Sequence, residues 1–310
     1  MRSYLKGKRF IALIAAIVLL ILVAPYFTKF VDSLSPSDKW SISEDGLIWY
    51  PQNRGAVEYT ETVLNDTSEF TLSKIVYMSK GERIYALLRV PKTSENRKPA
   101  MILLPGATVT KEAEQDRASV LAGWGYITLS IDERGNSGET GGGMKSMDDE
   151  YLLFSQNNEP VQHKMVFDVL RAYDFLKARN DVDYNNIAVL GESMGGRLAI
   201  MAGAVEPRIK AVVGISTAGY GSLAAQSPDA NVAGFFRSID PDAYIGKIAP
   251  RMLLMIHSAN DTVIPIGMAQ KTFAYANEPK KFIVVGCRTH GWCDDMAPVL
   301  KEEIGAIFAR

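Results

Sequence analysis

Histidine and cysteine are the scarcest reactive residues of this chain, with three and two copies among 310 residues. Positive and negative charges nearly cancel, at a formal net charge of -1, so no global attraction to nucleic acid or acidic polymers is implied. We find no repeat period, no heptad run and no block of Lys or Arg beyond the first residues. These absences exclude a nucleic-acid binder. The remaining composition, 47% hydrophobic and 22% charged, is that of a packed globular protein.

One long uncharged run lies at the N-terminus. Residues 10–27 contain no charged side chain, and a helix of that length spans roughly 27 Å, close to the ~30 Å hydrocarbon core of a bilayer. Basic residues, which favour the cytoplasmic side, precede the run: Arg2, Lys6, Lys8 and Arg9. We therefore predict that residues 1–28 form an uncleaved signal-anchor helix. The protein would be a single-pass cell-membrane protein with its main domain extracytoplasmic.

Two alternatives compete with the membrane anchor. A cleaved signal peptide needs a small-residue cleavage site, and the best candidate, Val23-Ala24, is followed at once by Pro25. A buried core helix is the second alternative. The anchor is the interpretation we carry forward.

After the N-terminal run the chain is first polar and then contains regular short apolar runs. Residues 29–70 are polar and are predicted to be a juxtamembrane spacer, packed in part against the domain. The apolar runs 74–78 and 84–90, separated by Gly81, predict a β-hairpin. Six more short apolar runs are typical of strands buried on both faces: 101–104, 126–131, 187–190, 211–215, 252–256 and 282–285.

Helical stretches lie between most of these runs: 161–178, 195–204, 266–276 and 297–308. The alternation after an antiparallel start predicts an α/β domain over 71–310, with an eight-stranded, mostly parallel sheet flanked by helices. Two long segments, about 139–160 and 217–249, do not fit the alternation. Loops of such length are usually functional or partly disordered. We interpret both as lid material, with surface decoration as the alternative.

The sharpest motif is Gly-Glu-Ser-Met-Gly-Gly at 191–196. It follows a predicted strand and precedes a predicted helix, the context that the G-x-S-x-G nucleophile elbow requires. There a tight, strained turn exposes the serine hydroxyl, and the flanking positions must lack bulky side chains. This predicts Ser193 as the nucleophile. The backbone N–H of Met194, at the start of the helix, is predicted to stabilise a developing oxyanion.

Serine needs a base, and three histidines allow a choice by elimination. His163 lies early in the 161–178 helix and is expected at the surface. His257 ends a strand, where we expect structural hydrogen bonding within the loop. His290 follows the last predicted strand and precedes the last helix. It alone suits the chain order Ser, acid, His, so it is predicted to be the base.

The acid is expected at the end of the penultimate strand, where Asp261 lies. Its role would be to fix the imidazole tautomer and to stabilise the imidazolium formed during attack. The alternative is a turn aspartate that caps Thr262 or the helix after Pro265.

From about residue 72 to its end, the chain resembles the α/β-hydrolase superfamily, particularly its esterase, lipase-like and serine-aminopeptidase-like branches. Residues 132–138, Asp-Glu-Arg-Gly-Asn-Ser-Gly, are similar to the D-x-R-G-x-G-x-S loop of that branch, with Ser137 in place of the second glycine. The resemblance implies that Asp132 and Arg134 brace the site as a buried, hydrogen-bonded pair. The Asp261 segment is similar to the family's H-G-x-x-D-x-x-V-P, with Ser258 where glycine is usual.

The resemblance also implies a second oxyanion donor in the loop after the third strand. The family commonly has His-Gly there, and this chain has Pro105-Gly106. Because the donor is a backbone amide, the loss of the histidine need not abolish it. Ala107 is the predicted donor, with Thr108 as the alternative.

Cys287 and Cys293 flank His290, three residues away on each side. Outside the cytoplasm they can form a disulfide that braces the histidine loop, if the loop brings their Cα atoms within ~7 Å. Two unrelated buried thiols are an equally open alternative. A zinc site of Cys287, His290 and Cys293 lacks a fourth ligand and would consume the base. We therefore predict no metal and no other cofactor.

These residues predict acyl transfer to water, with small-molecule carboxylic esters as the first substrate class. A serine peptidase or aminopeptidase is the alternative within enzymes, because the Gly195-Gly196 pair also occurs in peptidase branches of the superfamily. A non-catalytic, membrane-tethered binding protein on a hydrolase fold is the alternative of another class. The sequence does not indicate the oligomeric state.

Overall fold

A computed structural model describes residues 38–143, 145–221 and 223–309. Within it, Asp38–Gln52 and Ala56–Arg310 form one unit. The predicted signal-anchor helix, residues 1–28, lies outside the described residues. No helix among the described residues combines the length and the apolar character needed to cross a membrane.

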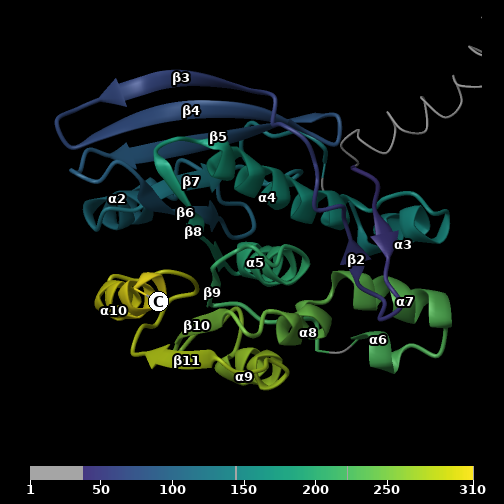
Figure 1. Ribbon diagram of the computed structural model, residues 1–310. Helices are drawn as coiled ribbons and strands as arrows, with labels where there is room; N and C mark the ends of the chain where they lie inside the picture. Colours follow the sequence, from purple (N-terminus) through teal and green to yellow (C-terminus); the bar gives the residue numbers. More distant parts are fainter. Residues whose placement is uncertain (1–37, 144, 222, 310) are drawn as a thin grey trace, which may run out of the picture. The chain divides into compact units, whose positions relative to one another are not determined.

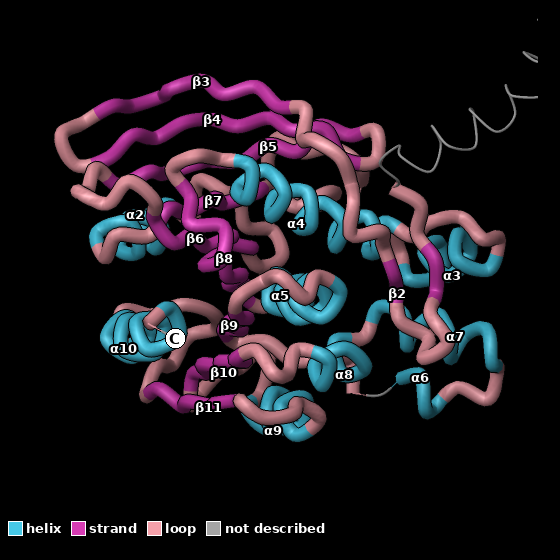
Figure 2. The backbone as a smooth tube through the Cα atoms, in the orientation of Figure 1, coloured by secondary structure: helices cyan, strands magenta, loops and turns pink. Residues whose placement is uncertain are grey.

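The strands that follow one another along the described chain form two sheets (Figure 2). They are β1 (Ser41–Ile42), β2 (Ile48–Trp49), β3 (Tyr59–Asp66), β4 (Phe70–Ser79), β5 (Glu82–Pro91), β6 (Lys98–Leu104), β7 (Ile127–Ile131), β8 (Val182–Glu192), β9 (Ala211–Ile215), β10 (Met252–Ser258) and β11 (Lys280–Val285).

The helices between the strands cover both faces of the larger sheet (Figure 1). They are α2 (Gln115–Gly123), α3 (Met147–Ser155), α4 (Val161–Ala178), α5 (Met194–Val205), α6 (Leu223–Gln226), α7 (Ala230–Ile239), α8 (Pro241–Tyr244), the 3-10 helix η1 (Ile245–Lys247), α9 (Ile266–Ala274) and α10 (Met296–Phe308).

The larger sheet has nine strands in the order β11-β10-β9-β8-β6-β7-β5-β4-β3. The strands at one end of this order, from β11 to β7, pair in parallel with their neighbours. The pairs β7-β5, β5-β4 and β4-β3 at the other end are antiparallel. The α/β class and the antiparallel start are thus confirmed, and each of the eight predicted strands is present. The chain reverses its strand order next to β8, so the carboxyl ends of β6 and β8 meet at a switch point, where such sheets place their sites.

Period-two alternation explains why the central strands are buried on both faces. In β6, Ile102 and Leu104 pack into one hydrophobic cluster, and Met101 and Leu103 pack into the other. The first cluster includes residues of α4, α5 and α9, and the second includes residues of α2 and α10. Side chains of successive strand residues point to opposite faces, so both helical layers find apolar partners. The sheet is therefore a rigid support for the loops at its edge.

The prediction of a spacer over residues 29–70 is wrong for part of that segment. β3 adds a ninth strand to the sheet by antiparallel pairing with β4, and β1 and β2 form a small sheet of their own. All eight residues of β3 are exposed. Because neither face of this edge strand is buried, its sequence shows no apolar alternation, and pattern analysis has nothing to detect.

The two long segments predicted as lid material contain helices of their own. α3 lies in 139–160, and α6, α7, α8 and η1 lie in 217–249. α3 and α7 contact each other, and Phe154 of α3 stacks against Phe235 of α7 at a centroid distance of 5.6 Å. Figure 1 shows both helices beyond the helical layer formed by α4 and α5. The segments are ordered subdomain material next to the site.

Candidate active site

Ser193 occupies a strained turn between β8 and α5. Its φ of 52° and ψ of -112° lie in a region that L-residues rarely adopt. The turn closes tightly: a Cβ at Gly191 would lie 2.1 Å from the Gly195 carbonyl oxygen, and one at Gly195 would lie 2.2 Å from that of Leu104. Only glycine fits such approaches. The elbow geometry that the motif predicts is therefore present, and it leaves the serine partly exposed.

Two backbone amides flank this serine. Met194 is the first residue of α5, and Ala107 lies in the loop after β6. Neither amide donates a hydrogen bond to another group of the described residues. The two loops are adjacent, because the Gly195 N–H donates to the Pro105 carbonyl oxygen at 3.1 Å and a Cβ at Gly106 would lie 3.5 Å from the Cβ of Ser193. Two unused donors beside a nucleophile are the requirement for an oxyanion hole.

Asn136 fixes the loop that carries Ala107. Its Nδ2 donates to the carbonyl oxygens of Gly106 (3.0 Å) and Val109 (3.3 Å). Its Oδ1 accepts the N–H of Thr108 at 2.6 Å. The Thr108 amide is therefore occupied, and of the two donors considered from sequence, Ala107 remains available.

Asp261 and His290 form a hydrogen-bonded pair. Nδ1 of His290 lies 2.9 Å from Oδ2 of Asp261, and the carboxylate also accepts the N–H groups of Val263 and Ile264, each at 2.9 Å. Burial raises the pKa of Asp261, but the hydrogen bonds from Ile264, His290 and Val263 outweigh it, and the net pKa is lowered. The carboxylate is thus ionised at neutral pH and can only accept. Nδ1 must carry a proton, which leaves Nε2 of a neutral ring as the basic nitrogen.

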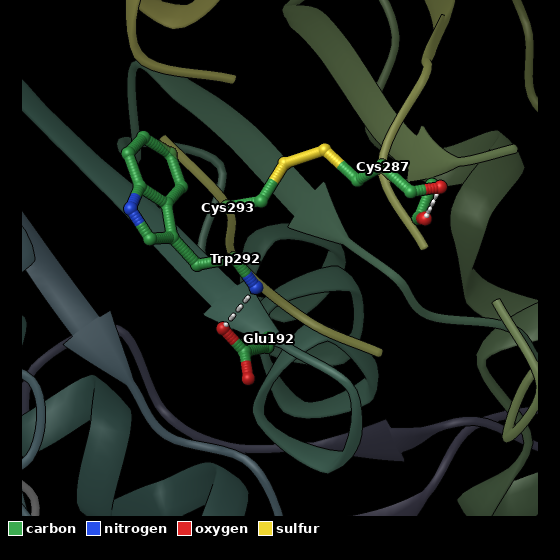
Figure 3. Close-up of a disulfide and its surroundings, with 5 residues drawn as sticks. Glu192, Cys287, Trp292 and Cys293 are labelled. Atoms are coloured by element: carbon green, nitrogen blue, oxygen red, sulfur yellow. Dashed lines mark hydrogen bonds between the residues drawn. A yellow bond between two sulfur atoms is a disulfide. The ribbon is translucent and has the colours of Figure 1, made fainter. Parts of the chain in front are cut away.

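The loops that carry the acid and the histidine are joined to each other. Ser258 Oγ donates to the Cys287 carbonyl oxygen at 2.7 Å, which gives a use for the serine where the family has glycine. The structure joins Cys287 to Cys293 in a disulfide with a Cα–Cα distance of 6.6 Å. This bond closes the short loop around His290 (Figure 3). The cross-link limits how far the imidazole can move away from Asp261.

Glu192 connects the histidine loop to the elbow. Its Oε2 accepts the backbone N–H of Trp292 at 2.9 Å, as Figure 3 shows, and the guanidinium of Arg117 lies 3.0 Å away. A Cβ at Gly291 would lie 2.2 Å from Oε1 of the same carboxylate. The residue before Ser193 therefore contacts both residues that follow His290. This contact brings the two loops together.

Asp132 and Arg134 are both buried, but the predicted pairing between them is wrong. Asp132 accepts the Nζ of Lys111 at 2.6 Å and its backbone N–H at 2.8 Å. Arg134 donates to both carboxylate oxygens of Asp168, at 2.9 and 3.0 Å. Both residues follow the end of β7, and each pairs with a different segment: Asp132 with Lys111 in the loop after β6, and Arg134 with Asp168 of α4. Their bracing role is retained through separate ion pairs.

The other two histidines have structural partners, although Nε2 of His257 also lies 3.7 Å from Oδ2 of Asp261. His257 is buried and its Nε2 lies 2.8 Å from the Ile264 carbonyl oxygen, which confirms structural hydrogen bonding within that loop. The surface position predicted for His163 is wrong. This residue is 0% exposed, with Nε2 2.9 Å from Ser238 Oγ and its ring against Trp40 and Phe154. Trp40 and two lid residues, Phe154 and Ser238, cover this side chain, and helical periodicity does not reveal contacts of that kind.

A cavity of about 400 Å³ opens over Ser193, and both lid segments contribute to its wall. Its lining is mainly apolar, with a few charged and polar side chains. The apolar part consists of Met147, Val161, Met165, Leu198, Met201, Ile239, Val263, Ile264 and Met268. Ala107, Ser193 and Met194 lie in the same wall. An apolar pocket that contains a few convergent polar groups is the usual form of a small-molecule site.

Three residues that the structure places at this site were not identified from sequence: Asn136, Glu192 and Arg197, of which Arg197 lines the cavity. A charged residue inside the elbow was the available signal for Glu192, and Arg197 follows the elbow by one helical turn. Asn136 lies within the loop motif that the resemblance covered. Their partners come from distant segments, so spacing alone does not assign them.

The fold and this site define a hydrolase of the α/β type. Matching solved structures share the fold: the acetyl xylan esterase from Paenibacillus sp. R4 superposes with a TM-score of 0.71 at 18% identity, over 82% of this chain and 90% of that one. Acetyl xylan esterase 1 from Thermoanaerobacterium gives 0.68 at 19% identity, over 81% and 88%. The acetyl xylan esterase (AXE1) family model matches residues 62–241, more than half of the chain. The chain belongs to this family.

Curated relatives match a shorter part of the chain at higher sequence identity. The YfhR protein of Escherichia coli O157:H7 is 29% identical over 150 residues, which are 47% of this chain and 53% of YfhR. The putative hydrolase YtaP of Bacillus subtilis is 26% identical over 152 residues, or 47% of this chain and 50% of YtaP. The chain thus matches about half the length of these relatives.

Proposed function

We propose that the protein hydrolyses carboxylic esters through an acyl-enzyme, with Ser193 as nucleophile, His290 as general base and Asp261 as the residue that orients it. The observation that carries the proposal is the Asp261–His290 hydrogen bond in a loop that Glu192 ties to the elbow. The remaining support is the strained conformation of Ser193 beside two unused amides.

The chemistry follows from these positions. Nε2 of His290 takes the proton of Ser193 Oγ as that oxygen bonds to the ester carbonyl carbon, and the Asp261 carboxylate stabilises the imidazolium. The carbonyl oxygen becomes an oxyanion, which accepts from the N–H groups of Ala107 and Met194. The imidazolium returns its proton to the leaving alkoxide as the C–O bond breaks. Water, deprotonated by the same nitrogen, then releases the acid and restores the serine. No cofactor enters these steps.

The cavity indicates the size of the substrate. An acetyl group fills only a small part of about 400 Å³. The rest accommodates a larger acyl or alcohol part against apolar side chains. We therefore propose small-molecule esters that are bulkier than a simple acetate.

The test compares esters with amides. For the purified domain we expect turnover of butyrate and hexanoate p-nitrophenyl esters to exceed that of matched aminoacyl p-nitroanilides by at least about 100-fold in kcat/KM. Ser193→Ala should abolish ester turnover, and Ser119→Ala, an exposed serine on α2, should leave it unchanged. Amide rates equal to or above ester rates would favour the peptidase alternative instead. Ester turnover that persists in Ser193→Ala would overturn the nucleophile.

We further propose that residues 1–28 anchor the protein in the cell membrane with the catalytic domain on the extracytoplasmic side. The uncharged run 10–27 and the basic residues before it support this proposal. The full chain should remain in the pellet after carbonate extraction, and a variant that lacks residues 1–28 should appear in the supernatant. Release of the full chain by carbonate would contradict the anchor.

A further inference from the structure

The active-site cavity carries an uneven set of charges. Three of its lining residues are charged: Lys145, Glu150 and Arg197. Apolar side chains make up most of the remaining wall, so a charged group of a substrate would meet few other partners there. The balance among these three residues therefore decides which substrates the cavity accepts.

Glu150 is already committed to the fold. It is 1% exposed, and its Oε2 accepts the backbone N–H of Val161 at 2.7 Å. Val161 begins α4, so the carboxylate caps the positive end of that helix. Burial raises the pKa of Glu150, against the lowering effect of its hydrogen bonds to Val161 and Gln162. The helix end thus offsets the negative charge of Glu150. Lys145 and Arg197 are the two charged residues of the lining that remain to attract a substrate.

Arg197 is held in place and has donors to spare. Its Nε donates to the Ala218 carbonyl oxygen at 2.8 Å, and its Cζ lies 4.4 Å from the centroid of the Tyr220 ring. Within the part of the chain that the structure describes, its two terminal nitrogens make no hydrogen bond and no ion pair. A guanidinium fixed by its Nε and by stacking presents these nitrogens as a fork that matches a carboxylate.

Arg197 and Ser193 line the same cavity and lie close together in the sequence. Ser193 caps α5, and the N–H of Arg197 donates to the Ser193 carbonyl oxygen at 3.3 Å, so one helical turn separates the two residues. Helical side chains lean toward the N-terminus, which directs the guanidinium back toward the serine. Because both residues line one cavity of about 400 Å³, an acyl chain that joins the ester carbonyl to a carboxylate must be short enough to fit within it.

Two neighbours of Arg197 bear on the argument. Burial raises the pKa of Asp242, and the charge of Arg197 counteracts part of that rise, but the two side chains form no ion pair among the described contacts. Lys145 is exposed and lines the cavity, and it has no hydrogen-bond or ion-pair partner among the described residues, so it adds positive charge there. Neither neighbour neutralises the guanidinium.

We propose that the cavity selects esters whose acyl part carries a carboxylate, that Arg197 binds this carboxylate through its terminal nitrogens, and that Lys145 adds long-range attraction. The substrate class is the half-ester of a short dicarboxylic acid. This inference rests on the proposed ester hydrolysis and goes beyond it, because the acetyl group of the family's name carries no charge.

The test uses two methyl esters that differ only in charge. Monomethyl glutarate carries a carboxylate, and methyl 5-amino-5-oxopentanoate replaces it with an uncharged amide of the same shape. Methanol release at pH 7 should give a kcat/KM about 10- to 100-fold higher for the acid, as expected for a charge-assisted hydrogen bond. The ratio should fall as salt is raised, because Lys145 is exposed and its contribution is screened.

Variants assign the preference to one residue. In Arg197→Met the acid-to-amide ratio should fall to near one, mainly through a higher KM for the acid, and Arg197→Lys should retain part of it. Lys271→Met, which removes an exposed cation on α9, should keep the wild-type ratio. For Arg197→Met the measured quantity is the ratio of kcat/KM for the two substrates with the same protein sample. A partial loss of folded protein lowers both values equally and leaves the ratio unchanged.

Two outcomes would overturn the inference: a wild-type ratio near one, or a ratio that Arg197→Met leaves intact. Both are distinguishable from failure of the proposed hydrolysis. If the proposed hydrolysis itself fails, neither ester is turned over, or turnover persists in Ser193→Ala.

Discussion

Replacing His290 with glutamine should lower kcat by a factor on the order of 10⁴–10⁶, because removal of the base from a serine triad has about that effect in hydrolases of this mechanism. Glutamine preserves the size and polarity of the side chain. It cannot take the proton of Ser193, and it cannot store positive charge beside Asp261. The measurement is steady-state turnover of p-nitrophenyl butyrate by the two proteins at equal folded concentration.

The control for this experiment is His163→Gln, which changes a buried histidine that lies outside the catalytic pair. We expect its kcat to fall by less than about tenfold, since it touches neither Ser193 nor Asp261. A loss of under 100-fold in His290→Gln would contradict the assignment of the base. Comparable losses in both variants would do the same.

The second large effect is a loss of folding stability at acid pH that depends on His163. Ser238 Oγ has one proton, which it donates to the Phe235 carbonyl oxygen at 2.7 Å, so it must accept from Nε2–H of His163 at 2.9 Å. Nδ1 is then the unprotonated nitrogen, and it is buried with no hydrogen-bond partner among the described residues. Protonation of this nitrogen would place a charged N–H in an apolar environment beside Trp40 and Phe154.

Burial accordingly lowers the pKa of His163 from 6.5 to about 3, opposed by the hydrogen bond with Ser238 and assisted by the charge of Lys80. The folded-state pKa is below that of the unfolded chain, so the unfolded chain gains a proton first as the pH falls. Stability from this group is therefore complete above pH 6.5 and decreases below it, by about 1.4 kcal/mol per pH unit. Between pH 6.5 and 4.5 the free energy of unfolding should fall by roughly 2 kcal/mol from His163 alone.

The measurement is urea unfolding of the wild type and of His163→Gln from pH 7.5 to 4.5. Carboxylates titrate in both proteins, so the difference between their slopes isolates His163. The wild type should lose stability more steeply below pH 6.5 than the variant. Parallel curves would show that His163 does not remain neutral in the folded protein.

Sequence analysis identified the sheet because its central strands are buried on both faces. The buried parts of β6, β8 and β9, residues 101–104, 187–190 and 211–215, are unbroken apolar runs for that reason, and the elbow follows from the glycines that its tight turn requires. The order Ser193, Asp261, His290 was also readable, since each residue follows a strand end. These features depend on local pattern, which a single sequence contains.

Other features depend on partners that no local pattern specifies. The edge strand β3 is exposed along its length and carries no apolar signature. Lys111 is 1% exposed because Asp132, from a distant segment, balances its charge in the interior. The position of His163 near the start of a helix favours the surface, but residues of the lid segments cover this side chain. In each case tertiary packing overrides what local pattern favours.

The central claim is that Ser193 is a nucleophile activated by His290. Labelling with a fluorophosphonate, followed by peptide mapping, tests it most directly, because the reagent reacts with activated serines and the modified residue can be located. The account predicts a single adduct on Ser193 in the wild type, none on this peptide in Ser193→Ala, and a labelling rate at least about 100-fold lower in His290→Gln. An unlabelled Ser193 in the folded wild type, or wild-type labelling in His290→Gln, would contradict it.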